Sequence, residues 1–449
     1  MRSAFAALAL AACGASPTPS PSPPQPPPAL AGRVVLISVD GMMPDTYLDP
    51  DAHGLRVPMM RHLVASGASG RVHGVMPTVT YPTHTTMVTG VPPSVHRIVA
   101  NKPLDPLSKN QNGWYWYAED IAVPTLYQAV EARGGTSALI EWPVAVGAHA
   151  SFVVPEYWRA ITDDDKKLQR AISTPGVLDA VEHEHPDLWR YLRPGDVEDR
   201  AQFDIARTLL ATRHPDLTLV HVFQVDDAEH ESGPWSPGAN AALENVDTLL
   251  GQLVAQLEQS PEWPRTTLFV VSDHGFAPVL HELHLGALLV KHGLVHETAD
   301  HKVDAASAAV NAAGGTALIY VLDPAKAGDV DAAIAELGDH VARRISHAEL
   351  VQLGGDPAAS FAIVAAPTYA FSDARTGDVV TDVSPRGTHG WPPTDPQMAA
   401  SIIVYGPHVP HVTLGTVDML DLAPTMAALL GVALPTAVGK PISVLVGAR

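Results

Sequence analysis

The stretch "RVVLISVD", residues 33–40, decides the fold, because it is a short, uninterrupted apolar run that ends in an acidic residue. A strand that is apolar on both faces is typical of a parallel sheet whose two faces are covered by helices. Three further runs read as buried parallel strands of the same kind: 216–226, 266–275 and 399–407. Helical patterns such as residues 245–259 lie between these runs. The sequence therefore predicts an α/β fold with a doubly wound, mostly parallel sheet.

Residues 280–385 have a different pattern, which predicts a small α+β lobe inserted beside the main sheet. Two segments have helical periodicity, "HELHLGALLVKHGLV" (281–295) and "DVDAAIAELGDHVARR" (329–344). Two others, "GTALIYVL" (315–322) and "SFAIVAAP" (360–367), are strand-like. We expect this lobe to belong to a single catalytic domain that extends over residues 33–449.

The N-terminal residues are predicted to direct export. Residues 1–12 combine one arginine with a short apolar run, which is typical of a secretory signal peptide and too short to span a bilayer. Cys13 ends a Leu-Ala-Ala-Cys sequence that resembles the lipobox of bacterial lipoproteins; the alternative is ordinary cleavage near Ala12. The resemblance implies a lipidated N-terminus on a Pro/Ser-rich linker over residues 13–32. We expect a lipoprotein on the periplasmic side of the outer membrane or at the cell surface.

Composition limits the partners of this chain. Its formal net charge is −20, so we expect no nucleic-acid-binding patch. A small phosphate substrate remains compatible with this charge, because bound metal ions can reverse the local field. Cys13 is the single cysteine, which excludes an internal disulfide.

Acidic residues follow three of the predicted strands: Asp40, Asp226 and Asp273. Because ligands bind at the carboxyl ends of parallel strands, we expect these carboxylates to converge, although each could instead cap a following helix. Three histidines lie near them or near the last strand: His230, His274 and His389. Mixed Asp/His ligation suits zinc better than magnesium. Six ligands are too many for one tetrahedral ion and predict two zinc ions about 4 Å apart.

The stretch "VMPTVTYPTHTTMVTG", residues 75–90, contains a candidate nucleophile, Thr80. It precedes Tyr81-Pro82, which is predicted to open a helix with proline in its first turn. A hydroxyl at this position lies beside free N–H groups and the positive helix end, both of which favour a bound phosphate. Threonine attacks at neutral pH only if a metal or base activates it. The alternative role for Thr80 is a helix cap.

The ordered set of motifs resembles one family. The stretches "VVLISVDG", "PTVTYPTHTTMVTGVPPSVHRIVANK", "VDDAEHESGP", "VSDHG" and "GTHGW" are similar to the alkaline phosphatase superfamily, and within it to the nucleotide pyrophosphatase/phosphodiesterase (type I phosphodiesterase) family. The resemblance implies an alkaline-phosphatase-like sheet and hydrolysis of phosphodiester or pyrophosphate bonds in small molecules or nucleotides.

The resemblance also implies a role for each site residue. Thr80 matches the nucleophile, which forms a covalent phosphoryl intermediate, and Asn101 matches the amide that binds a nonbridging phosphoryl oxygen. One zinc site is implied by Asp226, His230 and His389. The other is implied by Asp40, Asp273 and His274, with Thr80 coordinating there as well.

Several features depart from the family pattern or leave alternatives open. Thr83 stands where the family usually has asparagine, and we expect it to accept a backbone N–H bond; Asp227 stands where a small polar residue is common. The cluster Trp114–Tyr117 either receives a planar group or packs in the core, and Lys102 either contacts phosphate or is a solvated charge. The alternative functions are a phosphomonoesterase or phosphonate hydrolase on the same scaffold, and a non-catalytic surface-binding lipoprotein.

Overall fold

A computed structural model describes residues 30–110, 113–158, 162–192 and 199–447, so Cys13 and the N-terminal segment lie outside the described residues. Among the described residues, the largest sheet has eight strands in the order β17–β2–β16–β6–β1–β5–β3–β4. Their bounds are β1 Arg33–Val39, β2 Ala68–His73, β3 Ser137–Trp142, β4 Phe152–Pro155, β5 Leu217–Val222, β6 Thr266–Val271, β16 Ala400–Tyr405 and β17 Val412–Asp418. No helix of the described chain is long and apolar enough to cross a membrane.

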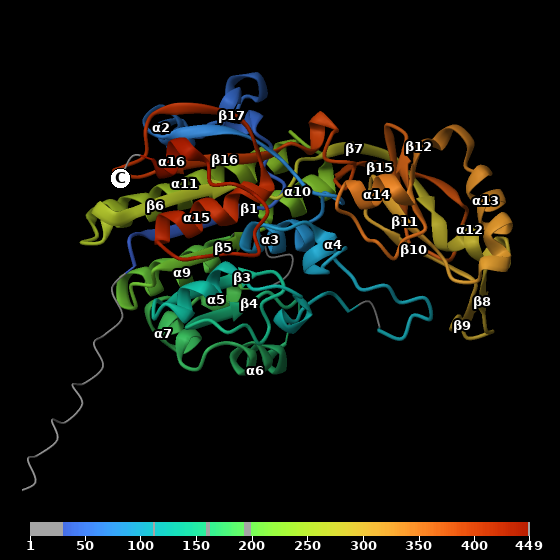
Figure 1. Ribbon diagram of the computed structural model, residues 1–449, viewed down its shortest axis with the longest axis horizontal. Helices are drawn as coiled ribbons and strands as arrows, with labels where there is room; N and C mark the ends of the chain where they lie inside the picture. The colour runs from blue at the N-terminus through green and yellow to red at the C-terminus, as the bar shows by residue number, and fades with distance from the viewer. Residues whose placement is uncertain (1–29, 111–112, 159–161, 193–198, 448–449) are drawn as a thin grey trace, which may run out of the picture.

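Helices cover both faces of this sheet, as the continuous apolar strands predict (Figure 1). In β1, Val35 and Ile37 pack on one face, and Val34 and Leu36 pack on the other. The first face carries α2 (Pro58–Ser66), α7 (Val177–Glu184), α8 (Leu188–Tyr191), α9 (Arg200–Thr212) and α11 (Pro237–Gln259). The second carries α3 (Thr80–Thr89), α5 (Leu126–Ala132), α15 (Leu422–Leu430) and α16 (Ser443–Val446). The α/β fold with a large, mostly parallel sheet is thereby confirmed.

The strand predicted over 399–407 is not parallel to its neighbours. β16 lies between β2 and β6 and is antiparallel to both. The reason is the path of the chain: it leaves β6 at the carboxyl edge of the sheet, forms the strands β7 to β15, and re-enters the sheet from that same edge. A strand that enters from this edge must run opposite to β6.

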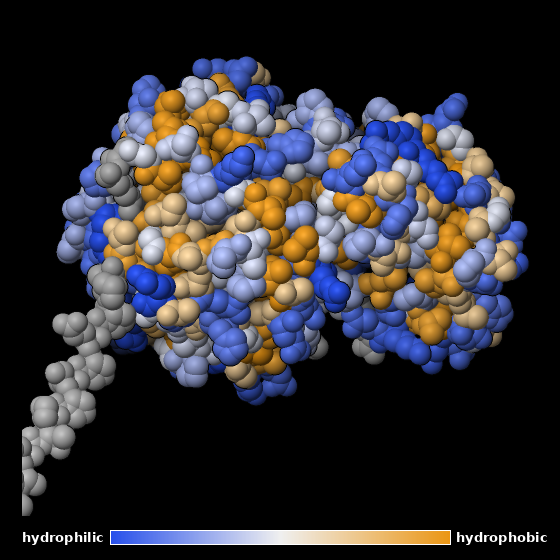
Figure 2. Space-filling model, in the orientation of Figure 1, coloured by the Kyte–Doolittle hydropathy of each residue, from blue (hydrophilic) through white to orange (hydrophobic). Residues whose placement is uncertain are grey.

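The segment between β6 and β16 forms three smaller sheets beside the main one (Figure 1). It has a hydrophobic core of its own, which includes Leu288, Ile319 and Ile363. The strands are β7 Ala277–His284, β8 Val295–Glu297, β9 Val303–Ala306, β10 Ala308–Ala312, β11 Thr316–Val321, β12 Val341–Ser346, β13 Phe361–Ala365, β14 Thr368–Ser372 and β15 Val380–Thr388, and the helices are α12 Leu285–Lys291, α13 Ala327–Ala335 and α14 His347–Gln352. Figure 2 shows the outline of the molecule narrowing between this part and the larger body.

Two helices predicted in this segment are shorter than expected. Residues 281–284 belong to β7, and α12 begins only at Leu285. β7 is the central strand of the order β14–β7–β15 and pairs with a neighbour on each side. Likewise, the helix predicted over 329–344 ends at Ala335, and its last residues form part of β12, an edge strand paired with β13. Sheet pairing overrides the helical periodicity in both places.

Candidate metal centre

The three acidic site residues converge at the carboxyl ends of β1, β5 and β6. Asp40 directly follows β1, and its backbone N–H donates to the carbonyl of Val222 at the end of β5. Asp273 lies just beyond β6. Asp226, which was expected at the end of a strand, instead lies in the first turn of α10 (Gln224–Ser232), because β5 already ends at Val222. The side chains nevertheless meet at the same edge of the sheet.

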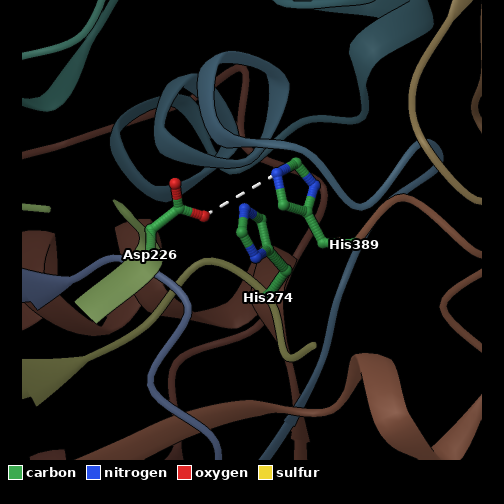
Figure 3. Close-up of side chains that lie close together, drawn as sticks. All are labelled: Asp226, His274 and His389. Carbon is green, nitrogen blue, oxygen red and sulfur yellow. Dashed lines mark ion pairs between the residues drawn. The ribbon is translucent and has the colours of Figure 1, made fainter. Parts of the chain in front are cut away.

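One cluster joins Asp226, His274 and His389, whose ligand atoms all lie within 4.8 Å of one another. Figure 3 shows the two imidazole rings beside the Asp226 carboxylate, with Nε2 of His389 3.8 Å from Asp226 Oδ1. The two rings are stacked, with centroids 3.8 Å apart. His274 lies just after β6 and His389 directly follows β15, so the two histidines come from the beginning and the end of the segment between β6 and β16.

A second cluster joins Asp40, Asp273 and His274, again with ligand atoms within 4.8 Å of one another. His274 Nε2 lies 3.3 Å from Asp40 Oδ1 and 3.1 Å from Asp273 Oδ2. The other oxygen of Asp273, Oδ1, accepts a hydrogen bond of 3.2 Å from the backbone N–H of Gly41. One oxygen of Asp273 is thus held by backbone, and the other faces the cluster.

These clusters differ from the division that the family resemblance implies. His274 belongs to both clusters, whereas His230 belongs to neither. His230 still lies beside the first cluster, one helical turn after Asp226, with its Nε2 3.4 Å from Asp226 Oδ2. The two groups of ligands therefore share one imidazole at their junction.

Backbone carbonyls orient two of the histidine rings. His389 Nδ1 lies 3.2 Å from the carbonyl of Thr78, and His230 Nδ1 lies 3.1 Å from the carbonyl of Gly387. A ring that donates through Nδ1 presents an unprotonated Nε2 on its other side, which is the form that binds a metal. In both residues, Nε2 is the nitrogen nearer to Asp226.

The donor set at this edge fits divalent zinc. Within the described residues, five buried atoms of the clusters have no hydrogen-bond partner: Asp40 Oδ1, Asp226 Oδ1, Asp273 Oδ2, His274 Nδ1 and His274 Nε2. Buried polar atoms are rarely left unpaired, and unpaired ones point to a bound ion, water or a function. Carboxylate oxygens and imidazole nitrogens together are the ligands that zinc takes in catalytic sites.

The electrostatics of the clusters agree with this fit. Burial and the neighbouring Asp226 carboxylate raise the pKa of Asp40 to about 7. Burial and Asp40 raise the pKa of Asp273 well above its usual range, while burial and His389 lower the pKa of His274 far below its usual range. His274 is therefore neutral, as a metal ligand must be, and a divalent cation between the carboxylates would favour their ionised forms.

Thr80 is the first residue of α3 and differs from the other threonines of that helix. Four hydroxyls donate to carbonyls one turn earlier in the chain, at distances between 2.8 and 3.0 Å: those of Thr83, Thr85, Thr86 and Thr89. In the described part of the chain, the Thr80 hydroxyl has no such acceptor. Thr83 thus donates to Val79, which differs from the acceptor role expected for it, and the turn is nevertheless formed. Back-bonding thus accounts for the other four threonine hydroxyls of α3 but not for that of Thr80.

The start of α3 is connected to both clusters. The carbonyl of Thr80 lies 2.8 Å from His84 Nδ1, and the same nitrogen lies 3.7 Å from Asp273 Oδ2. On the other side, the carbonyl of Thr78 contacts His389. These contacts connect the N-terminus of α3 to one candidate ligand of each cluster.

Asn101 lies beside the N-terminus of α3. Its Oδ1 accepts a hydrogen bond of 2.9 Å from the backbone N–H of Tyr81. This bond fixes the orientation of the amide, because only the oxygen can accept from an N–H donor. The NH₂ group of Asn101 therefore remains available as a donor next to Thr80.

Aromatic side chains form a wall near this end of α3. Trp114 and Trp116 are stacked with ring centroids 5.9 Å apart, and Trp114 lies 5.1 Å from the ring of Tyr81. Three further rings extend the wall, namely those of Tyr157, Trp158 and Phe223. Lys102 lies with Nζ 5.7 Å from the ring centroid of Trp114, at the edge of this group.

Sequence reasoning missed several buried polar residues around the centre: Glu141, Glu156, His221 and Glu229. Both carboxylate oxygens of Glu229 are buried without a hydrogen-bond partner among the described residues. The sequence does contain an indication of His221, because a polar histidine interrupts the apolar run "LTLVHV" of β5. In the same way, Glu141 lies inside the apolar strand β3, and Glu156 directly follows β4.

Comparison with known families finds one match that spans most of the chain. The model of the type I phosphodiesterase / nucleotide pyrophosphatase family matches residues 34–392. This range includes all the residues of the two clusters, as well as Thr80 and Asn101.

Curated relatives match over about half of the chain. Ectonucleotide pyrophosphatase/phosphodiesterase family member 3 of Mus musculus is 26% identical over 253 residues, which are 54% of this chain and 24% of the relative. Member 5 of Homo sapiens is 26% identical over 54% of this chain and 44% of the relative. The human bis(5'-adenosyl)-triphosphatase ENPP4 is 23% identical over 55% of this chain and 48% of the relative. The matched part thus spans less than half the length of each of these relatives.

Solved structures share the fold over nearly the whole chain. Murine ectonucleotide pyrophosphatase/phosphodiesterase 5 superposes with a TM-score of 0.65 at 20% identity and covers 91% of this chain and 97% of the murine one. The human counterpart gives a TM-score of 0.63 at 19% identity and covers 89% of this chain and 95% of its own. At this identity the likeness establishes the fold.

Proposed function

Because this chain belongs to the type I phosphodiesterase / nucleotide pyrophosphatase family, we propose that it hydrolyses phosphodiester or pyrophosphate bonds of a small molecule or nucleotide, with Thr80 as nucleophile and two bound zinc ions. Family membership supports hydrolysis of phosphate ester or anhydride bonds. The observation that carries the finer proposal is the convergence of unpaired, buried carboxylate and imidazole atoms beside the first residue of α3.

The candidate ligands would be assigned to the two ions as follows. Asp226, His389 and His230 would hold one ion, Asp40 and Asp273 would hold the other, and His274 stands between the two. Bound zinc would supply positive charge that favours the ionised Thr80 hydroxyl and stabilises the oxygens of the phosphoryl group.

Thr80 would then attack phosphorus from one side while the bond from phosphorus to the leaving oxygen breaks on the other. The Thr80 proton passes to solvent, and the leaving oxygen takes a proton from solvent. The NH₂ group of Asn101 and a free N–H in the first turn of α3 would donate to a nonbridging oxygen. A water oxygen later attacks the phosphorus of the threonyl-phosphoryl group, and the bond from phosphorus to Thr80 Oγ1 breaks. This oxygen takes up a proton while the attacking water gives one up, so Thr80 regains its hydroxyl.

Two features of a solved relative are consistent with this proposal. Murine ectonucleotide pyrophosphatase/phosphodiesterase 5 has been solved as an inactive form in which a threonine is replaced by alanine, in complex with AMP. A nucleotide has a planar base, and the wall that contains Trp114 and Trp116 offers aromatic faces on which such a base can stack. We therefore include nucleotides in the proposed substrate class.

We predict that this enzyme prefers diesters to monoesters. A monoester dianion has an additional charged oxygen, and the threonine-nucleophile monoesterases of this superfamily typically meet it with a Lys-x-Arg pair. The corresponding segment here, residues 139–150, contains neither Lys nor Arg. One missing charge-assisted contact is worth roughly 1.5–3 kcal/mol, or about 10- to 150-fold in rate. The measurement compares kcat/KM for bis-p-nitrophenyl phosphate and p-nitrophenyl phosphate at one pH.

A clear advantage for the monoester would contradict the diesterase assignment and favour the phosphomonoesterase alternative. Lys102→Ala is the informative companion variant, because Lys102 is a cation near Asn101 that could contact the additional oxygen. If it does, the variant should lose activity on the monoester more than on the diester.

We also propose that Cys13, which lies outside the described residues, anchors the protein through a lipid. Cys13→Ala should then move the protein from the membrane fraction to the soluble fraction without changing kcat/KM. Fractionation followed by immunoblotting measures this directly. Equal distribution of the wild type and the variant would contradict lipidation and leave ordinary cleavage near Ala12.

A further inference from the structure

A chain of hydrogen bonds runs behind the metal centre and connects Asp40 to the helix that carries Thr80. His221 Nε2 lies 3.0 Å from Asp40 Oδ2, and His221 Nδ1 lies 2.8 Å from Glu156 Oε2. The hydroxyl of Tyr81 donates to the other oxygen of Glu156 at 2.7 Å. The four residues come from the end of β1, from β5, from the end of β4 and from α3, so tertiary packing alone brings them together.

These four hydrogen-bonded residues are shielded from water. Tyr81 and His221 have no exposed surface, and Glu156 and Asp40 are 1% and 3% exposed. Rings of His84 and Phe223 pack against the imidazole, with centroids 4.4 Å and 5.8 Å from it. Buried charged groups hold one geometry when all of their hydrogen bonds are made, because the alternatives leave a charge unpaired.

Both nitrogens of His221 have hydrogen-bond partners. Each faces a carboxylate oxygen, and Nδ1 also lies 3.2 Å from the carbonyl of Glu141. The imidazole is therefore held from both sides, with Nε2 committed to Asp40 and Nδ1 to Glu156.

His221 makes the two oxygens of Asp40 unequal. Oδ2 is hydrogen-bonded to the imidazole. Oδ1 is buried and has no hydrogen-bond partner among the described residues, and it lies 3.3 Å from His274 Nε2. A carboxylate without such a partner could turn about its terminal bond and present either oxygen, or both, to an ion. The contact with His221 removes this freedom.

We propose that His221 is a positioning residue that fixes Asp40 so that only Oδ1 is presented to the metal ion, and that Glu156 and Tyr81 hold His221 for this task. The inference rests on the proposed function, since it takes Asp40 as a metal ligand. It extends that function by assigning a role to three buried residues that touch neither the ion nor the reacting atoms.

The test measures zinc affinity in wild type, His221→Leu and His221→Gln by competition with a chromogenic chelator. Hydrogen-bonded partners of metal ligands typically contribute about 10- to 100-fold to metal affinity. His221→Leu should weaken one of the two ions by about this factor and leave the other unchanged. His221→Gln keeps an N–H donor of suitable length and should recover part of the loss. Tyr81→Phe leaves His221 in place but frees one end of Glu156, and should give a smaller loss at the same ion.

A matched control separates positioning from stability. His96 is also fully buried and hydrogen-bonded, to Thr86 Oγ1 at 3.0 Å and to the N–H of Ile98 at 3.1 Å, but it contacts no candidate metal ligand. His96→Gln should lower the unfolding temperature and leave both zinc affinities at the wild-type values. If His221→Leu does not fold, His221→Gln and Tyr81→Phe carry the test.

Wild-type zinc affinity at both sites in His221→Gln and Tyr81→Phe, or in a folded His221→Leu, would overturn the positioning role. In that case His221 would only stabilise the fold. Wild type that binds no zinc would overturn the proposed function together with this inference, so the two failures are distinguishable.

Discussion

Replacing Thr80 with alanine should lower turnover by several orders of magnitude while the protein keeps its bound metal. The hydroxyl is the proposed attacking group, and methyl cannot replace it in forming the threonyl-phosphoryl intermediate. Metal retention is expected because two carboxylates and one imidazole of the neighbouring cluster remain in place. Thr80→Ser keeps a hydroxyl and should retain a fraction of the activity. Steady-state kinetics with bis-p-nitrophenyl phosphate, together with elemental analysis, measure both outcomes.

Thr89→Ala is the matched control for this change. Thr89 lies at the other end of α3, and its hydroxyl donates to the carbonyl of Thr85 at 2.8 Å, as back-bonding threonines do. Loss of this bond should cost about 1 kcal/mol of stability or less and leave kcat unchanged. Near-wild-type turnover by Thr80→Ala would contradict the nucleophile assignment and make water the attacking group. A capping role would not explain such a result, because the N-cap of α3 is Val79 and no side chain caps the helix.

Replacing His274 with alanine should weaken both metal ions and abolish measurable turnover. A neutral imidazole has one free lone pair and binds one ion. Because His274 lies against the candidate ligands of both clusters, its removal takes a donor from one ion and opens a gap beside the other. His389 belongs to one cluster only, and His389→Ala should therefore lose one ion preferentially and keep the other. We expect about two zinc ions per chain in the wild type, about one in His389→Ala and fewer than one in His274→Ala.

His281→Ala provides the control for the loss of a histidine. Its Nδ1 lies 2.8 Å from Asp382 Oδ1 on an exposed part of the inserted segment, and His281 belongs to neither cluster. This variant should keep both ions and full activity. No more than one tightly bound ion in active wild type would contradict the two-metal mechanism, and equal losses in His274→Ala and His389→Ala would show that the removal of His274 affects a single ion.

The sequence determined which residues meet at the site, because their chemistry and their position relative to apolar runs are local properties of the chain. Continuous apolar runs predicted strands buried on both faces, and acidic residues just beyond them predicted carboxylates at one edge of the sheet. Thr80 was distinguishable because it precedes an aromatic-proline pair in a family-like motif, and the structure adds that its hydroxyl lies outside the back-bonding pattern of α3.

Tertiary structure alone decided how these residues are grouped. Periodicity reports which face of an element is buried, but it does not report the direction in which the chain re-enters a sheet or which side chains meet across it. For this reason the antiparallel course of β16, the position of Asp226 on a helix and the shared place of His274 were not predictable. The chain from Asp40 through His221 to Glu156 joins residues 181 and 65 positions apart. Contacts over such separations depend on the packing of several elements at once, and no local pattern encodes them.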